Sequence, residues 1–375
     1  MDKDRKRNAY RTVFFLCAIL LAFTVADFVK KDRFFSENEN RILTQKPELS
    51  RETLLSGEFA KEYEAYVNDQ FISRDTWIYM KTYMDLLLQK RTVNGVYLAA
   101  DGYLVEQHLP EDYPEELVET RLAKLAELVE QYPRAMVFLA PTADNILTNK
   151  LPDFAPYYDQ RALLSQVRET IGGEHVINAF DILQQHEDEE IYYHTDHHWT
   201  TLGVYYGYLA WAQACDIYPA RYKLSRLETV SDDFQGTLHS ATGLDAVFDE
   251  IQMFAQTAER PVTITYDYME TSYSFYEESY LDTKNQYGYF LDDNHGLVEI
   301  ETNSAYPRTL FLIKDSYANA MVPLLSAHYQ KIYVLDLRYF HGKLFDFMNS
   351  MEEAEEMDVL VLYNCIHFLE NFNYY

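Results

Sequence analysis

Short apolar runs alternate with helical patterns along most of this chain, and this alternation constrains the fold more than any other feature. Runs with the length and β-branched content of buried strands lie at residues 135–140, 309–313, 331–335 and 358–362. Helical patterns lie at residues 115–132, 160–171, 201–215, 317–329 and 339–351. Strands that alternate with helices are typical of a parallel sheet joined by crossover connections. The sequence therefore predicts an α/β fold with a central parallel sheet.

Two regions depart from this alternation. Residues 93–106 predict a hairpin, because two apolar segments flank the turn sequence Ala100-Asp-Gly102. The region around 230–300 contains an alternating run that includes Val262, Ile264 and Tyr266. Alternation of this kind predicts a β-rich decoration inserted into the sheet domain.

The N-terminus is basic and is followed by an apolar run. Residues 1–11 contain five basic and two acidic residues, and residues 12–26 contain none of either kind. A basic flank before an apolar run places the flank in the cytoplasm and the rest of the chain outside, and about 20 residues are needed to cross a bilayer. We expect an uncleaved anchor. A cleavable signal is the alternative, because Thr24-Val-Ala26 resembles a small-residue cleavage site.

These patterns divide the chain into three parts. We expect a basic tail and transmembrane anchor (or signal peptide) at 1–31, a linker and N-terminal helices at 32–92, and the main domain at 93–375. The helical pattern of the second part is interrupted near Ser73, which predicts two helices. The acidic run at 352–356 predicts a solvated helix end.

Charge and cysteine content exclude some classes of protein. The formal net charge is −28, so no basic surface is available to release counterions from the phosphates of a nucleic acid. The cysteines Cys17, Cys215 and Cys365 do not form a disulfide framework. We expect free thiols, with a Cys215–Cys365 pair as the alternative.

A cluster of ionisable side chains and a tryptophan occupies residues 194–199. Its members are His194, Asp196, His197, His198 and Trp199. Imidazoles and carboxylates are costly to bury unpaired, so such a cluster indicates a site. In an extended segment Asp196 and His198 share a face and His197 points the other way. The Asp196 carboxylate can then bond to the His198 ring.

A serine follows the strand at 309–313 after two residues. In open α/β sheets, ligands collect beyond the carboxyl ends of the strands, and free N–H groups at a helix start can hold an oxyanion. A plain helix N-cap is the other interpretation of Ser316. A serine nucleophile needs a base, and the base needs a carboxylate. We therefore predict that Asp196, His198 and Ser316 meet as a nucleophilic triad.

A metal site is the second interpretation of the histidine cluster. His194, Asp196, His197 and His198 are all possible ligands for zinc or iron. The run resembles the His-x-His-x-Asp-His pattern of metallo-hydrolases. Its leading histidine pair is absent, however, and no second cluster of His and Asp stands out in the sequence. We predict no metal.

The segment Asp196-His-His-Trp199 resembles the motif that names the DHHW proteins, which are similar to the alginate O-acetyltransferase group of SGNH-hydrolase-like proteins. Shorter segments that resemble this family lie at residues 36–41, 66–71, 74–75, 96–98, 101–104, 234–237, 314–316 and 335–338. The resemblance implies an SGNH-hydrolase-like three-layer αβα fold, with the triad in permuted order. It implies that Asp196 orients His198, which is the base for the nucleophile Ser316.

The resemblance also implies a reaction. Members of the family take an acetyl group from a membrane-bound O-acyltransferase partner and pass it to a hydroxyl of a surface polysaccharide, without a cofactor. We expect the backbone N–H groups of Ser316 and Tyr317 to hold the oxyanion, with Asn319 and Arg338 as further candidates. His197 and Trp199 are expected to support the site.

The resulting hypothesis is an extracytoplasmic O-acetyltransferase that is anchored in the cell membrane, or secreted if the N-terminal segment is cleaved. A carbohydrate esterase with the same triad is one alternative. A non-catalytic component of a polysaccharide export complex is another.

Overall fold

The computed structural model describes residues 2–36, 41–244, 247–351 and 357–374. The chain forms two compact units, residues 1–90 with 241–244, and residues 91–240 with 245–375. Residues 37–40, within the predicted polar linker, and the acidic run 352–356, the predicted helix end, lie outside the described residues.

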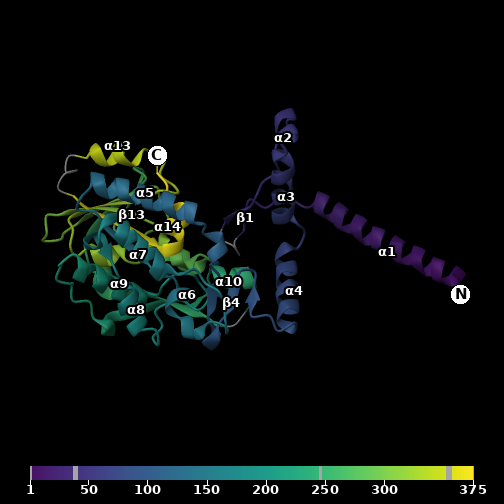
Figure 1. Cartoon of the computed structure of the whole chain (residues 1–375), viewed down its shortest axis with the longest axis horizontal. Helices are drawn as coiled ribbons and strands as arrows, with labels where there is room; N and C mark the ends of the chain where they lie inside the picture. Colours follow the sequence, from purple (N-terminus) through teal and green to yellow (C-terminus); the bar gives the residue numbers. More distant parts are fainter. Residues whose placement is uncertain (1, 37–40, 245–246, 352–356, 375) are drawn as a thin grey trace. The chain divides into compact units, whose positions relative to one another are not determined.

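The first unit is mainly helical (Figure 1). Its elements are α1 (Asp2–Val29), β1 (Phe35–Ser36), β2 (Arg41–Ile42), α2 (Arg51–Ser56), α3 (Glu58–Gln70) and α4 (Arg74–Leu87). Helix α1 includes a stretch, Arg5–Val29, that is long and apolar enough to cross a membrane. The predicted interruption near Ser73 is present, because Ser73 adopts a left-handed conformation (φ 53°) between α3 and α4.

Two buried polar residues at the end of α3 bind the backbone of the preceding linker. Asp69 accepts a hydrogen bond of 2.8 Å from the Thr44 N–H. Gln70 bonds to both backbone groups of Arg33, at 2.9 Å to its N–H and 2.8 Å to its carbonyl. These bonds satisfy side chains that would otherwise be costly to bury.

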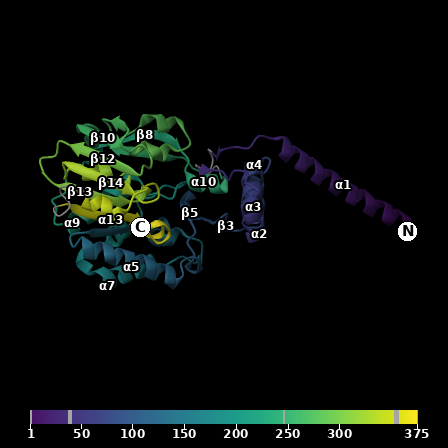
Figure 2. The ribbon, with the colours of Figure 1, turned by 90° about the horizontal axis from the view of Figure 1, so that it is seen from above.

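The second unit is built on an eight-stranded sheet with the order β11-β10-β12-β14-β13-β15-β6-β7, part of which can be followed in Figure 2. Five neighbouring strands pair in parallel. They are β14 (Lys331–Asp336), β13 (Thr309–Lys314), β15 (Asp358–Asn364), β6 (Met136–Ala140) and β7 (Val176–Ile177). The predicted central parallel sheet is therefore confirmed.

Part of the inserted region extends this sheet instead of decorating it. Strands β10 (Val262–Tyr266), β11 (Glu270–Ser272) and β12 (Leu297–Thr302) pair antiparallel, and β12 joins β14. In β10 every second residue is buried, as expected for a strand with one face on the core. Strands β8 (Leu227–Phe234) and β9 (Asp249–Phe254) form a separate hairpin.

Helices cover both faces of the sheet, which gives three layers. One group is α5 (Glu115–Gln131), α7 (Gln160–Ile171) and α14 (Cys365–Asn371), and the other is α8 (Phe180–Gln185), α9 (Thr201–Ala214) and α12 (Val322–Leu325). Phe138 of β6 contacts Trp199, just before α9. Tyr363 of β15, in register with Leu139, contacts Phe372 next to α14. Phe138 and Leu139 are neighbours in β6 and point to opposite faces of the sheet, and Tyr363 lies on the same face as Leu139. The two groups of helices therefore cover opposite faces of the sheet.

The smaller elements surround this sheet. They are β3 (Thr92–Val93), β4 (Val96–Leu98), β5 (Leu104–Glu106), α6 (Ala143–Ile146), α10 (Thr237–Thr242), α11 (Ala255–Ala258) and α13 (Leu344–Asn349). Strands β4 and β5 form the predicted hairpin, and β3 adds a third strand. The turn needs positive φ angles at Asp101 (58°) and Gly102 (83°), which glycine adopts at little cost.

The predicted helix at 317–329 is wrong. Its place is taken by a 3₁₀ turn (Ser316–Ala318) and the short α12. Pro323 has no N–H, so a helix that began at residue 317 could not continue its hydrogen bonds through this position. The predicted helix at 339–351 is shortened to α13, because the Asp336 carbonyl accepts the N–H groups of Tyr339 and Phe340 and forms a turn after β14.

Candidate active site

Asp196, His198 and Ser316 lie in direct hydrogen-bond contact beyond the carboxyl end of β13. The His198 Nδ1 atom is 2.6 Å from Asp196 Oδ1, and His198 Nε2 is 2.8 Å from Ser316 Oγ. The three residues are buried, with exposed fractions of 4%, 5% and 7%. A carboxylate, an imidazole and a hydroxyl in this chain of contacts can activate the hydroxyl as a nucleophile. Their catalytic roles stay a prediction.

The loop that holds the two triad members before α9 is fixed by Asp249 of β9. The Asp249 carboxylate accepts the His194 N–H at 2.8 Å, the Thr195 N–H at 2.8 Å and the Thr195 hydroxyl at 2.6 Å. A β-bridge between Tyr192 and Trp199 closes the loop. The loop is therefore a tight turn held by hydrogen bonds and not an extended segment.

Asp196 is held by four hydrogen-bond donors. Besides the imidazole of His198, its carboxylate accepts the His198 N–H at 3.0 Å, the Thr237 N–H at 2.9 Å and the Thr237 hydroxyl at 3.1 Å. Burial alone would raise the pKa of Asp196, but the imidazoles of His197 and His198 and the hydrogen bonds together lower this pKa well below its usual range. The carboxylate is therefore charged at neutral pH.

Gly236 and Thr237 contact the Asp196 carboxylate and were not predicted from the sequence. A Cβ atom on Gly236 would lie 2.2 Å from Asp196 Oδ2, so only glycine leaves room for the carboxylate. Both residues belong to a segment, 234–237, that resembles the DHHW proteins. The resemblance of this segment to the family was the feature of the sequence that pointed to Gly236 and Thr237, but it gave no role to either residue.

The predicted orientation of His197 is wrong. In an extended segment His197 would point away from Asp196 and His198, but in the structure it does not. Its ring lies beside that of His198, with centroids 3.9 Å apart, because the loop is a turn. The Nδ1 atom is 2.8 Å from the Thr237 hydroxyl oxygen. The Thr237 hydroxyl donates its hydrogen to Asp196, so its oxygen accepts a hydrogen bond from His197. The neutral His197 ring therefore carries its hydrogen on Nδ1. Burial and the neighbouring His198 lower the pKa of His197 to about 4, which leaves it neutral at pH 7.

Two aromatic residues fix the positions of the imidazole and the serine. The Tyr287 ring stacks on His198 at 3.8 Å, and its hydroxyl donates to the Ser316 carbonyl at 3.3 Å. The fully buried Trp199 donates its indole N–H to the Tyr317 carbonyl at 2.9 Å. Trp199 therefore links the histidine loop to the segment after Ser316, and its supporting role stays a prediction. Tyr287 was not predicted.

The geometry also bears on the metal interpretation. His194 stacks on Tyr103 and bonds to Asp249, away from the other three candidate ligands. The ligand atoms of Asp196, His197 and His198 lie within 4.8 Å of one another. Both ring nitrogens of His198 are already bonded, however, and a metal ion would have to displace Asp196 or Ser316. The arrangement therefore fits a nucleophilic triad better than a metal centre.

One of the two expected oxyanion donors is already engaged. The Tyr317 N–H donates to Asp315 Oδ1 at 3.0 Å, which is a correction to the prediction. Among the described residues, the Ser316 N–H donates no hydrogen bond and remains available. The other oxygen of Asp315 accepts the Asn364 N–H at 3.0 Å and the His367 Nδ1–H at 2.9 Å.

The side chains of Asn319 and Arg338 belong to a polar network around Lys314, and among the described residues neither side chain bonds to Ser316; only the Asn319 backbone N–H does, at 3.1 Å to the Ser316 carbonyl. The buried Lys314 ammonium donates to the Asn319 side-chain oxygen at 2.7 Å and lies 3.3 Å from Asp336. Arg338 binds both carboxylate oxygens of Asp336, at 2.9 and 2.6 Å. The side chains of both residues are therefore engaged in this network, and neither is placed as an oxyanion donor.

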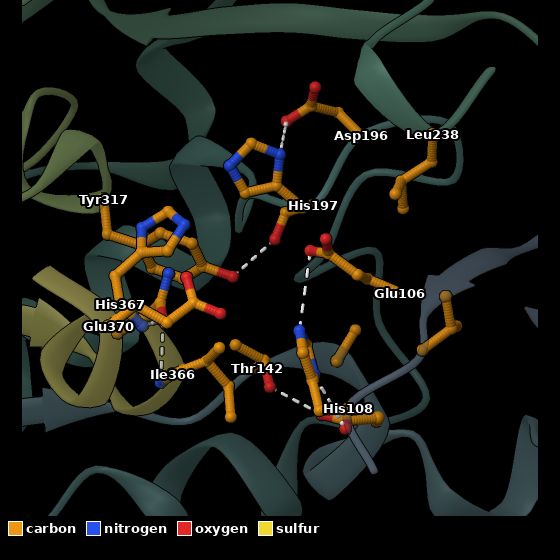
Figure 3. A pocket seen from close by; sticks show the side chains of 14 residues that line it. Glu106, His108, Thr142, Asp196, His197, Leu238, Tyr317, Ile366, His367 and Glu370 are labelled. Carbon is orange, nitrogen blue, oxygen red and sulfur yellow. Dashed lines mark hydrogen bonds and ion pairs between the residues drawn. The ribbon is translucent and has the colours of Figure 1, made fainter. Parts of the chain in front are cut away.

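A small cavity of about 40 Å³ adjoins the triad (Figure 3). Its walls come from the end of β5, the start of α6 and the region of α14, together with Asp196, His197 and Tyr317. The figure shows Glu106, His108, His367 and Glu370 around the same space. None of these four residues was singled out from the sequence.

Comparison with known proteins identifies the central part of the chain. Residues 159–335 match the family model described as DHHW protein. The predicted DHHW family resemblance is confirmed. The DHHW region contains the histidine loop, the inserted strands and Ser316. No curated protein matches the sequence.

Solved structures share the fold of the DHHW region and its surroundings. A DHHW family protein from Eubacterium siraeum is 24% identical with a TM-score of 0.62, over 74% of this chain and 93% of that chain. Bacillus cereus PatB1 with a sulfonyl adduct is 20% identical with a TM-score of 0.57, over 73% of this chain and 94% of that chain. The predicted three-layer αβα fold with a central parallel sheet is thereby confirmed.

Proposed function

We propose that this protein is an O-acetyltransferase that acts on a hydroxyl of a cell-surface or secreted polysaccharide. The observation that carries the proposal is the continuous chain of contacts from Asp196 through His198 to Ser316, at 2.6 and 2.8 Å. The resemblance to the alginate O-acetyltransferase group supports acetyl transfer as the reaction of these residues.

In the first step, Ser316 Oγ attacks the carbonyl carbon of the acetyl donor. The hydroxyl proton passes to His198 Nε2, and charged Asp196 stabilises the imidazolium through Nδ1. The Ser316 N–H donates to the oxyanion of the tetrahedral intermediate. The leaving group departs with the proton from His198, and the acetyl group remains as an ester on Ser316.

In the second step, a sugar hydroxyl attacks the acetyl-serine ester. Its proton passes to His198 Nε2, the tetrahedral intermediate collapses, and Ser316 Oγ leaves and recovers the proton. Transfer instead of hydrolysis requires that the sugar hydroxyl reaches the ester before water does.

The location of the protein is part of the proposal. Helix α1, preceded by basic residues, would anchor the chain with its second unit outside the cytoplasm. The acetyl group would then come from a membrane-bound O-acyltransferase partner, because acetyl donors are made inside the cell.

The experiment that tests this function compares transfer with hydrolysis. The full chain in neutral nanodiscs is incubated with 4-nitrophenyl acetate, with and without oligosaccharides, and the products are measured by mass spectrometry. Acetylated oligosaccharide that is absent with the Ser316→Ala variant supports transfer by the triad. Release of acetate alone, at a rate that oligosaccharide does not change, indicates an esterase. No turnover of any acetyl ester contradicts both enzymatic proposals.

A further inference from the structure

The cavity beside the triad is lined by more negative than positive groups. Four carboxylate residues contribute to its walls, namely Glu106, Asp144, Asp196 and Glu370. Among the described residues, no lysine or arginine lines it. The cavity therefore differs from the arginine-rich and lysine-rich sites that usually bind carboxylate or phosphate groups.

The histidines of the cavity compensate only part of this charge. His108 lies 3.0 Å from Asp144 and 3.5 Å from Glu106. Burial alone would lower the pKa of His108, but these two carboxylates raise it to about 10, so the ring is protonated at neutral pH. His197 is neutral. The cavity thus holds one firmly protonated imidazole against four carboxylates.

His367 is the remaining histidine of the cavity. Asp315 raises the pKa of His367 against the effect of burial, while the positive charge of Arg338 opposes this rise. Asp315 is itself a negative charge directly behind the ring, 2.9 Å from Nδ1. Protonation of His367 therefore neutralises Asp315 and leaves the excess of carboxylates in the cavity unchanged.

Polar atoms without partners are directed toward the same space. Asn364 lines the cavity and is 2% exposed. Its side-chain oxygen accepts the N–H groups of Ile366 and His367, whereas its Nδ2 donates no hydrogen bond among the described residues. The Nε2 atom of His367 also has no partner there. His367 is half-buried, but Asn364 is almost fully buried, and a polar group in such a place usually has a partner. The free Nδ2 of Asn364 therefore indicates a polar ligand in the cavity.

Size and position restrict what the ligand can be. About 40 Å³ holds a single hydroxyl, hydroxymethyl or amino group but not a sugar ring. Asp196 of the triad forms part of the cavity wall, together with His197 and Tyr317, the sequence neighbours of His198 and Ser316. A substituent in the cavity would therefore belong to the same molecule whose hydroxyl reaches Ser316.

We infer that this cavity is an acceptor subsite that takes one uncharged or amine substituent of a glycan and discriminates against uronic acids. The inference rests on the proposed function and names the class of its acceptor. A sugar carboxylate would meet four carboxylates, and the firmly protonated imidazole among them, His108, is already paired with Asp144 and Glu106. Like charges at close range are strongly unfavourable. The chain's net charge of −28 adds long-range repulsion against any polyanionic polymer.

Equilibrium binding tests the inference independently of turnover. Oligosaccharides of N-acetylglucosamine, glucosamine and galacturonic acid, of equal length, are titrated by calorimetry into the full chain in neutral nanodiscs. We expect the galacturonate oligomer to bind at least about tenfold more weakly than the other two at low ionic strength. Salt should reduce this ratio, because it screens the repulsion.

Charge-neutral variants connect the preference to the cavity. Glu106→Gln and Glu370→Gln should each reduce the ratio, whereas Glu130→Gln, an exposed position of α5 outside the cavity, should not. Two variants are used so that a folding defect in one leaves the other informative. Equal or tighter binding of galacturonate overturns the inference, as does a ratio that responds equally to all three variants. Failure of the proposed function is a separate result, namely that no acetyl group forms on Ser316.

Discussion

The Nε2 atom of His198 lies 2.8 Å from the Oγ atom of Ser316, although 118 positions separate the two residues in sequence. Among the described residues, the serine hydroxyl bonds to no other group. The Ser316→Ala variant should therefore lower the rate of acetyl-ester cleavage by about 10⁴-fold or more and keep the melting temperature of wild type. Steady-state kinetics and thermal unfolding of the two proteins check this. An active Ser316→Ala variant would remove serine from the mechanism.

The Asp196→Asn variant should keep the shape of the site but lose its charge. The amide cannot stabilise the His198 imidazolium and favours the wrong tautomer, so we expect a loss of about 10⁴-fold in kcat. Measurement of kcat for the variant and for wild type checks this. A loss below about tenfold would contradict the role of Asp196.

The same variant tests the lowered pKa of Asp196. A carboxyl whose pKa is lower in the folded than in the unfolded state stabilises the fold above the unfolded value of about 3.9, and this contribution is lost as the pH falls below it. The difference in unfolding free energy between wild type and Asp196→Asn should therefore be constant from pH 8 to pH 5 and shrink below about pH 4. A difference that grows as the pH falls would contradict the assignment.

Thr237 should be a positioning residue for the triad. Thr237→Val removes the hydroxyl that bonds to both Asp196 and His197, so we expect about 1–3 kcal/mol of destabilisation and a lower kcat with little change in KM. Thr237→Ser retains the hydroxyl and should recover most of kcat. If valine and serine variants had equal kcat values, the hydroxyl would have no part in positioning Asp196.

Gly236 should tolerate no side chain. The Cβ atom of Gly236→Ala would lie 2.2 Å from the Asp196 carboxylate and force it to move, at a cost of about 1–3 kcal/mol and with loss of activity. Gly173→Ala is the matched control, because nothing lies within 4 Å of a Cβ atom there. Urea unfolding and acetyl-ester cleavage distinguish the two. Equal stability and activity would show that the loop adapts freely.

The meeting of the triad could be predicted because it follows from local rules. Ser316 comes directly after a buried strand, where a sheet presents residues to ligands, and the short spacing of Asp196 and His198 lets one loop bond them. The partners of these residues could not be predicted in the same way. Thr237, Tyr287 and His367 reach the site from other elements, and only the folded chain brings them together.

The wrong predictions about the fold also have local causes. The apolar content of 317–329 favoured a helix, but Pro323 interrupts it and the segment instead fills the core. Strand β12 joins β14 by antiparallel pairing, which requires no crossover helix and leaves no periodic signal between the strands. The prediction that the Tyr317 N–H holds the oxyanion is also wrong for a local reason. Asp315, two residues earlier, accepts the hydrogen bond of that N–H.

Mass spectrometry of the peptide that contains Ser316 tests the central claim most directly. The full chain is mixed with an acetyl ester, quenched in acid within the first turnover and digested, with Ser316→Ala and His198→Gln as controls. We predict one acetyl group on Ser316 in the wild-type protein, none in the alanine variant, and a strongly reduced amount in the glutamine variant. Turnover of the ester with the acetyl group on another residue, or with no acetylated residue at all, would contradict the account.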